Sequence, residues 1–223
     1  MSTIAFLDFD GTLIRHDSGV ICAVPSARRG LVGPAIFAEL VATYLLSKLG
    51  LRTRTDAMRV GFRCYAGRSL EELRGIMTEL YDDHLRAQLS PAMMERLQAH
   101  REAGDRLVIL TASAYFVAEP IARALGIDEV IGTQVGFEGG LCTGVVEGQI
   151  IDGTAKLAAA QGVAARAGIA LDRCAFYTDH IADLPLLEAV GTPVAVGPNR
   201  ALLRVARSRG YRILPHGATL GAS

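Results

Sequence analysis

A short apolar segment near the N-terminus ends in two acidic residues, and this junction constrains the fold more than any other feature of the chain. Ile4–Leu7 has the pattern of a buried strand, and Asp8 and Asp10 follow it, with Gly11 next to allow a tight turn. Two carboxylates this close raise each other's pKa unless a cation or a proton is shared. Ligand sites of α/β proteins lie at the carboxyl ends of parallel strands. The junction therefore predicts a divalent cation site with one carboxylate available as a nucleophile.

Beyond residue 88 the sequence alternates short buried strands with helices, which is typical of a parallel sheet covered on both faces. The predicted strands are 106–110, 174–177 and 194–196, with a hairpin over 131–150 that turns at Gly139-Gly140. The predicted helices are 91–102, 115–125, one from 154, one near 185–189 and one after Pro198.

Strand signals are nearly absent between residue 14 and residue 89. Pro34 can open a helix whose apolar residues recur at helical spacing, and Thr55 can open a second one that runs to Phe62. Ser69 with Glu72 three residues later predicts a capped helix that runs toward Leu85. We expect an α/β fold with a core domain of residues 1–14 and 88–223, and a helical domain of residues 15–87 inserted after the first strand to form a lid.

Composition excludes several classes of protein. The 223 residues carry 23 basic and 23 acidic side chains, which gives no electrostatic reason to expect a nucleic acid or an anionic membrane as partner. The four cysteines are far apart without a CxxC pair, so neither a zinc motif nor a disulfide framework is indicated.

The most apolar later segment, 35–49, is interrupted by Glu39, Thr43 and Lys48 and is too short and polar for a membrane span. The N-terminus has no charged region or cleavage site of a signal peptide. We therefore expect a cytoplasmic protein without membrane contact.

Three further segments place polar side chains at strand ends or helix starts. Thr111, with Ala112 and Ser113, follows a buried strand and precedes a helix, where free N–H groups can hold a phosphate. Lys156 lies in a helix first turn, where its charge opposes the helix dipole and predicts a nearby anion. Taken alone, the hydroxyls are also compatible with helix caps and the lysine with an exposed side chain.

The last of these segments is a second acidic pair, Asp179 and Asp183, which follows the strand that ends at Tyr177. Asp183 is also compatible with a helix cap. Two acid pairs, a hydroxyl and a lysine at four strand-end positions are the groups that metal-assisted phosphoryl transfer requires.

Four segments of the chain resemble, in order and spacing, the four motifs of the haloacid dehalogenase-like hydrolase superfamily. They are Asp8-Phe9-Asp10-Gly11-Thr12-Leu13, Thr111, Lys156 and Asp179 to Asp183. The resemblance is greatest to its subfamily IB, the phosphoserine-phosphatase-like branch. It covers residues 1–13 and about 90–214, and it implies a Rossmann-like core with a C1-type helical cap.

The resemblance implies a phosphatase that hydrolyses a small phosphomonoester. Asp8 would be the nucleophile that becomes an aspartyl-phosphate, and Asp10 the acid–base residue. Mg²⁺ would be held by the Asp8 carboxylate, the Asp10 backbone carbonyl and Asp179, with Asp183 orienting the metal shell.

The phosphate itself would be bound by Thr111 and by the backbone next to it at Ala112 and Ser113. Lys156 would neutralise Asp8 and the transferring group, because a carboxylate and a phosphate dianion repel each other until cationic charge is in place.

Two positions depart from the pattern of this branch. Position 180 is His, which is either a tolerated loop residue or a contact that influences the ligand or metal site. Position 182 is Ala where phosphoserine phosphatases often carry Asn, and this weakens a strict assignment to phosphoserine.

Substrate choice is expected to depend on the inserted helices. The resemblance places Asp17 where phosphoserine phosphatases bind the substrate amine, and Arg59 or Arg63 could bind a carboxylate. The alternative interpretation is that Asp17 only caps a turn and that both arginines are solvated. The expected partner is a small phosphorylated metabolite, such as phosphoserine or a related amino-alcohol phosphate, for example histidinol phosphate.

Three other functional classes make different demands on these residues. A dehalogenase would lack Asp10, whereas a phosphotransferase or phosphomutase would keep it. A non-catalytic protein that binds a phosphorylated ligand would be expected to have lost one of Asp8, Asp10, Lys156 or Asp179, and all four are present. The sequence is compatible with a monomer and with a homodimer.

Overall fold

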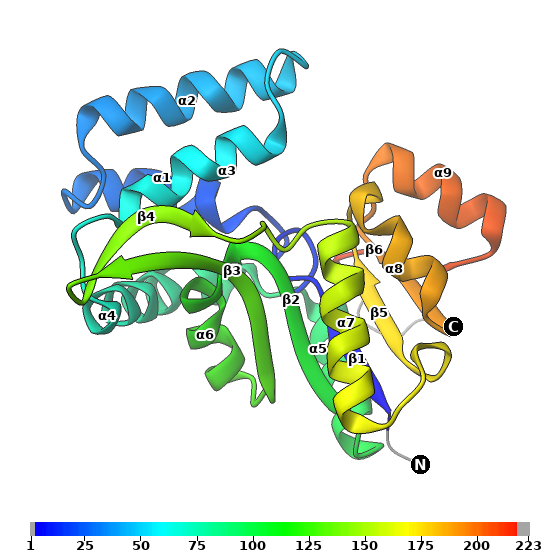
Figure 1. Ribbon diagram of the computed structural model, residues 1–223. Helices are drawn as coiled ribbons and strands as arrows, with labels where there is room; N and C mark the ends of the chain where they lie inside the picture. The colour runs from blue at the N-terminus through cyan, green and yellow to red at the C-terminus, as the bar shows by residue number, and fades with distance from the viewer. Residues whose placement is uncertain (1–2, 218–223) are drawn as a thin grey trace.

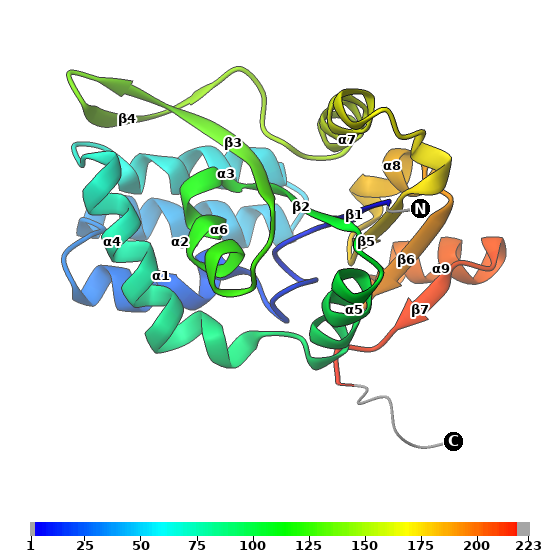
Figure 2. The same cartoon turned by 90° about the horizontal axis from the view of Figure 1, so that it is seen from below.

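A single twisted sheet organises the molecule, and the computed structural model describes it within residues 3–217 (Figures 1 and 2). The strands in space follow the order β4-β3-β2-β1-β5-β6-β7, and each neighbouring pair is parallel except β3 with β4. The strands are β1 (Ile4–Leu7), β2 (Arg106–Ala114), β3 (Glu129–Glu138), β4 (Leu141–Glu147), β5 (Ala175–Thr178), β6 (Thr192–Val196) and β7 (Arg212–Leu214).

Helices follow most strands and fill the long insertion after β1. The α-helices are α1 (Ser18–Arg28), α2 (Pro34–Lys48), α3 (Arg54–Phe62), α4 (Leu70–Leu80), α5 (Pro91–Glu102), α6 (Tyr115–Ala124), α7 (Thr154–Ala167), α8 (Leu184–Ala189) and α9 (Arg200–Arg209). Shorter helical turns are η1 (Arg63–Tyr65), η2 (Tyr81–Leu85), η3 (Arg86–Gln88), η4 (Leu171–Arg173) and η5 (Ile181–Asp183).

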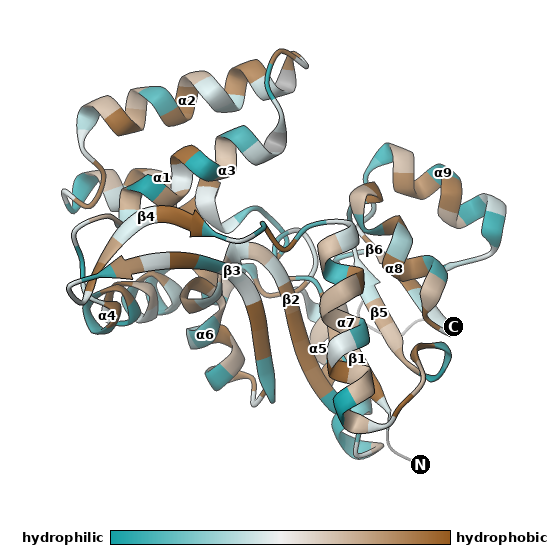
Figure 3. Ribbon diagram, in the orientation of Figure 1, coloured by the Kyte–Doolittle hydropathy of each residue, from teal (hydrophilic) through white to brown (hydrophobic). Residues whose placement is uncertain are grey.

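The central strand β1 is buried on both faces because its side chains alternate between two apolar cores. Ala5 and Leu7 join the core formed with α4, α5 and α6, whereas Ile4 and Phe6 join the core formed with α7, α8 and α9. The inner strands are accordingly apolar along their length (Figure 3). This burial fixes the end of β1, and therefore Asp8, in a rigid frame.

The predicted fold class is confirmed: a mostly parallel sheet flanked by helices, with a helical insertion after β1. The helices from α1 to α4 form this insertion, which we call the cap. Its helix starts follow local chemistry, since Thr53 and Asp56 make a capping box before α3 and the Ser69 side chain accepts from Glu72 N before α4. The domain boundaries at residues 14 and 88 stay a prediction.

The cap is also joined to the sheet at a point distant from it in sequence. The hairpin of β3 and β4 extends beside α3 and η1 (Figure 1), and its β4 strand exchanges backbone hydrogen bonds with the cap. Gly67 N donates to Cys142 O and Cys142 N donates to Arg68 O, both at 2.8 Å. The hairpin therefore belongs to the sheet at one end and supports the cap at the other.

Two strands differ from the sequence-based expectation. β2 continues beyond Leu110 to Ala114, with a register shift against β3 between Thr111 and Ala114. β7 was not predicted, because three residues at a sheet edge are too few to show a periodic pattern. Within residues 3–217, no helix combines the length and apolarity needed to cross a membrane.

Candidate active site

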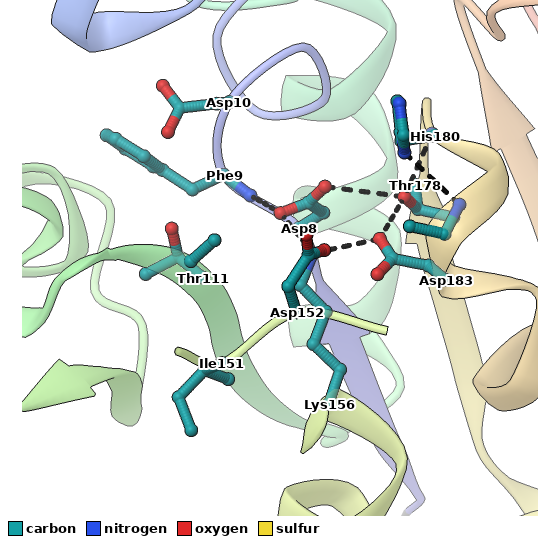
Figure 4. A network of polar contacts seen from close by, with 12 residues as sticks. Asp8, Phe9, Asp10, Thr111, Ile151, Asp152, Lys156, Thr178, His180 and Asp183 are labelled. Carbon is teal, nitrogen blue, oxygen red and sulfur yellow. Dashed lines mark hydrogen bonds and ion pairs between the residues drawn. The ribbon is translucent and has the colours of Figure 1, made fainter. Parts of the chain in front are cut away.

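Four polar side chains from β1, β5, α7 and η5 meet at the carboxyl ends of the central strands (Figure 4). Lys156 Nζ lies 2.7 Å from Asp8 Oδ1 and 2.8 Å from Asp183 Oδ2. Thr178 Oγ1 donates to Asp183 Oδ2 at 2.6 Å, and a longer contact of 3.3 Å reaches Asp8 Oδ2. Asp8 Oδ1 also accepts from Phe9 N at 2.8 Å. The arrangement holds the Asp8 carboxylate from both oxygens.

This cluster is almost fully removed from water, which makes its charge balance decisive. Lys156 is 2% exposed, Asp8 5% and Asp183 0%. Burial disfavours the Lys156 ammonium, but the two carboxylates more than offset this and raise its pKa. The lysine therefore stays charged, and the anion expected near this first-turn cation is present as two carboxylates.

Asp10 projects from the loop after β1 toward the cap, away from Lys156 (Figure 4). Its Oδ1 accepts from Ser18 N at 2.6 Å, at the start of α1, and its Oδ2 accepts from Ser113 Oγ at 2.7 Å. Burial, followed by the negative charge of Asp17, raises the pKa of Asp10 to about 7 despite these hydrogen bonds. A carboxyl with this pKa can give and take a proton near neutral pH.

Thr111 and its neighbours lie where β2 bulges against β3. Thr111 is buried, and its Oγ1 accepts from Ser113 N at 3.0 Å, which leaves its O–H to donate elsewhere. Ala112 O accepts from Thr133 Oγ1 at 2.8 Å. The Ser113 hydroxyl is directed to Asp10, so only its backbone remains in the predicted substrate-binding role.

Asp179 lies against the turn that follows Asp10. Gly11 has a φ of +72°, and a Cβ at this position would come within 2.5 Å of Asp179 Oδ2. Only glycine therefore allows the Asp179 carboxylate to approach the Asp10–Gly11 backbone this closely. Asn199 N donates to Asp179 O at 2.8 Å and fixes the loop from the other side.

The residues present fit a hard divalent cation. The donor set of the Asp8 and Asp179 carboxylates with the Asp10 carbonyl is made of oxygen atoms, the ligand type that Mg²⁺ prefers. Asp183 Oδ1 is buried and has no hydrogen-bond partner among the described residues, so a metal-bound water could satisfy it. Residues 3–217 contain no group of three His, Cys, Asp or Glu side chains placed to hold a metal, as expected for a set with two carboxylates and a carbonyl.

His180 and Ala182, the two positions that depart from the pattern of the branch, have local structural roles. His180 Nδ1 accepts from Ala182 N at 3.1 Å and caps the η5 turn, while His180 N donates to Thr178 Oγ1. This capping role agrees with the interpretation of His180 as a loop residue. Ala182 lines an open cleft beside the site.

The three predicted substrate-binding residues of the cap differ in their hydrogen bonds and ion pairs. Asp17 is exposed and caps α1 by accepting from Val20 N at 3.1 Å, yet its charge reaches Asp10. Arg63 Nη1 lies 2.8 Å from both carboxylate oxygens of Glu39. Arg59 has no hydrogen bond or ion pair within the described residues and lines the same cleft as Ala182.

Sequence reasoning assigned no role to Thr178 or to Ser18 N. Thr178 links the two carboxylates that Lys156 contacts, and its place at the end of β5 directly before Asp179 was the signal available. A backbone N–H such as that of Ser18 has no signal in a sequence.

Comparison with known proteins agrees with this geometry. The family model described as haloacid dehalogenase-like hydrolase matches residues 5–188, which include every motif above. The chain belongs to the haloacid dehalogenase-like hydrolase family. A relative that is 33% identical over 96% of this chain and 70% of its own length is phosphoserine phosphatase SerB1 of Mycobacterium tuberculosis. The predicted phosphoserine-phosphatase-like branch is thereby confirmed.

Two further similarities extend over nearly the whole chain. A histidinol-phosphatase of Neisseria meningitidis is 29% identical over 96% of this chain and 99% of its own length. A crystal structure of a protein of unknown function from Bordetella pertussis has a TM-score of 0.85 at 30% identity and covers 97% of this chain and 100% of its own. The predicted enzyme class is confirmed: this haloacid dehalogenase-like protein is a phosphatase, a hydrolase of phosphomonoesters.

Proposed function

We propose that the chain is a Mg²⁺-dependent phosphatase that cleaves a small amino-containing phosphomonoester through an aspartyl-phosphate on Asp8. The observation that carries this proposal is the position of Asp8 at the end of β1, with Lys156 Nζ 2.7 Å from one oxygen. The acid–base candidate Asp10 lies two residues further along the chain. A nucleophile, a neutralising cation and a proton donor are thus held by rigid elements around one strand end.

The first chemical step uses Asp8 and Asp10. A carboxylate oxygen of Asp8 forms a bond to phosphorus while the bond from phosphorus to the alcohol oxygen breaks, and Asp10 gives its proton to that oxygen. Its raised pKa, about 7, supports this role because the protonated form persists near neutral pH.

The second step regenerates the enzyme. Asp10, now ionised, takes a proton from a water molecule whose oxygen attacks phosphorus, and the bond from phosphorus to Asp8 breaks to release inorganic phosphate. Lys156 remains charged throughout and offsets the negative charge on Asp8 and on the transferring group. Thr111 would donate its O–H to a phosphate oxygen.

Mg²⁺ would be held by the carboxylates of Asp8 and Asp179 and the Asp10 carbonyl, and when bound it would reduce the repulsion between Asp8 and the phosphate dianion. The close approach of Asp179 to Gly11 and the unpartnered Asp183 Oδ1 support this assignment.

An open cleft of about 440 Å³ between the cap and the core supports a small substrate. Thr55 and Arg59 line it from α3, and residues 148–150 and 152–154 with Ala182 line it from the core. It borders the site because Ala182 precedes Asp183 and Gly153 precedes the helix of Lys156. Arg59 could pair with a carboxylate, and Asp17 could pair with an amine near Asp10. The names of the two relatives suggest phosphoserine and histidinol phosphate as the first candidates.

The test measures phosphate release from a panel of phosphorylated metabolites. Each is assayed in parallel with Mg²⁺, with EDTA, and with EDTA followed by an excess of Mg²⁺. The panel contains phosphoserine, histidinol phosphate, phosphoethanolamine and glycerol phosphate, with p-nitrophenyl phosphate as a generic substrate. We expect metal-dependent turnover that favours the amino-containing members. Turnover of glycerol phosphate alone would reject the proposed substrate class.

The reaction type needs its own readout. Recovery of all phosphate as inorganic phosphate supports hydrolysis, whereas transfer to an added alcohol or sugar phosphate would indicate a phosphotransferase or phosphomutase. Binding of phosphoserine without turnover in the wild type and in Asp8→Asn alike would indicate a non-catalytic ligand-binding protein.

A further inference from the structure

The bulge at the end of β2 directs one side chain away from the strand and toward the acid–base candidate. The register between β2 and β3 shifts between Thr111 and Ala114, so Ala112 and Ser113 lie in the irregular part. Bulges of this kind reorient side chains next to active sites. Here the reoriented side chain is Ser113, whose Oγ lies 2.7 Å from Asp10 Oδ2.

Several contacts fix the bulge. Ser113 N donates to Thr111 Oγ1, and Thr133 Oγ1 donates to Ala112 O while accepting from Ile151 N. Gly132 makes the close packing possible, because a Cβ there would lie 2.7 Å from Tyr115 Cα and 2.9 Å from Ser113 O. The position of the Ser113 hydroxyl is therefore set by both strands and by the loop before α7.

The hydroxyl shares Asp10 with a backbone donor from the cap. Ser18 N, at the first residue of α1, donates to the other oxygen at 2.6 Å. Asp10 is thus held between the core and the cap. Because the Ser18 donor belongs to the cap, the contact from Ser113 is the one that the rigid sheet supplies.

We propose that Ser113 is a positioning residue that fixes the Asp10 carboxyl on the leaving-group side of Asp8. This inference rests on the proposed function, since it assigns Asp10 its proton-donor role. Ser113 makes no bond to the substrate in this role. Its removal should therefore impair proton delivery to the leaving oxygen and leave phosphate binding unchanged.

The test compares two leaving groups in the holoenzyme. Ser113→Ala and wild type are assayed with Mg²⁺ on the best alkyl phosphate of the panel and on p-nitrophenyl phosphate. The value of kcat/KM reports the steps through phosphoryl transfer to Asp8, and the acidic nitrophenol needs no proton to depart. We expect Ser113→Ala to lose roughly 10-fold to 100-fold in kcat/KM on the alkyl phosphate and less than about 3-fold on the aryl phosphate.

Ser113→Thr is the matched variant, because it keeps a hydroxyl at the same position, and it should retain most of the activity on the alkyl phosphate. Inhibition by inorganic phosphate and the urea unfolding midpoint should be the same in wild type and both variants. Equal losses on the two substrates, or no loss in Ser113→Ala, would overturn the positioning role.

Failure of the proposed function would be seen separately, as absence of turnover in the wild type itself. If Ser113→Ala does not fold, the Ser113→Thr and Ser113→Cys pair replaces it. The cysteine thiol is a weaker hydrogen-bond donor than a hydroxyl, so a loss of kcat/KM in Ser113→Cys that is confined to the alkyl phosphate supports the proposal. Equal kcat/KM values of the Ser113→Cys and Ser113→Thr variants on that substrate reject it.

Discussion

The strand-end cluster and the exposed surface of the cap hold their polar side chains in different ways. In the core, Asp8, Lys156 and Asp183 are each at most 5% exposed, and Lys156 Nζ lies within 2.8 Å of both carboxylates. In the cap, Asp17 and Arg59 are exposed; Asp17 accepts a hydrogen bond from Val20 N, and Arg59 lines the cleft. The proposed chemistry therefore uses a rigid and costly charge cluster, whereas the proposed selectivity uses exposed side chains whose replacement should disturb little of the fold.

The largest expected effect comes from removing the nucleophile. Asp8→Asn should lower phosphate release by roughly 10⁴-fold or more. Its stability should not fall, because Lys156 and Asp183 remain as a balanced buried pair once one of the two carboxylates is neutral. Initial rates of phosphate release measure the expected loss of activity, and urea unfolding at pH 7 measures the expected unchanged stability. A large loss of stability would show that Asp8 has a mainly structural role.

Removing the lysine should instead damage the fold. Lys156→Met leaves Asp8 and Asp183 buried near Thr178 without their cation, which should cost about 3–5 kcal/mol of unfolding free energy at pH 7. Arg207→Met, on the exposed side of α9, is the control and should change stability by less than about 0.5 kcal/mol. A loss as small as that of the control would contradict the role of Lys156 as the cation that the two buried carboxylates require.

The cap offers a matched pair of arginines. Arg59→Ala should lower kcat/KM for phosphoserine by roughly 10-fold to 100-fold, the value of a charged hydrogen bond, and leave glycerol phosphate nearly unchanged. Arg63→Ala should change either value by less than about 3-fold, since Arg63 is already paired with Glu39. Similar effects of the two substitutions would remove the distinction between a ligand-facing and a cap-internal arginine.

A separate effect concerns pH and Asp10 in metal-free protein. Well below the ordinary aspartate pKa of 3.8, Asp10 is protonated in both the folded and the unfolded chain and contributes nothing to the pH dependence. As pH rises toward 7, the unfolded chain ionises first, because the folded pKa is raised to about 7, so the wild type loses stability relative to Asp10→Asn. Urea midpoints in EDTA between pH 4 and pH 8 measure this difference. Asp17→Asn should reduce it, and a difference that is independent of pH would contradict the raised pKa.

The sequence predicted more of the strand-end cluster than of the cap. Asp8, Lys156 and Asp183 were assigned to one site because strand ends of a parallel sheet converge, and the structure brings them into contact. Ser113 was predicted to bind phosphate through its backbone, and its hydroxyl was given no role, but the bulge directs that hydroxyl to Asp10. Register shifts depend on the packing of two strands, here through Gly132, and leave no periodic signal in either one.

The cap illustrates a second limit. Its helices were predicted from capping residues and apolar spacing, but the pairing of Arg63 with Glu39 and the cleft position of Arg59 depend on how helices pack. The domain boundaries, the role of Asp17 and a cytoplasmic location stay predictions.

The hydrogen bonds between Cys142 and the Gly67–Arg68 segment have a consequence for biosynthesis. A ribosome releases the cap helices well before β4, so the newly made cap waits for its backbone partner while the second half of the chain is still being translated. Any premature stop before residue 141 therefore leaves the cap without these two backbone hydrogen bonds, and the cap gains this support only late in the synthesis of the protein.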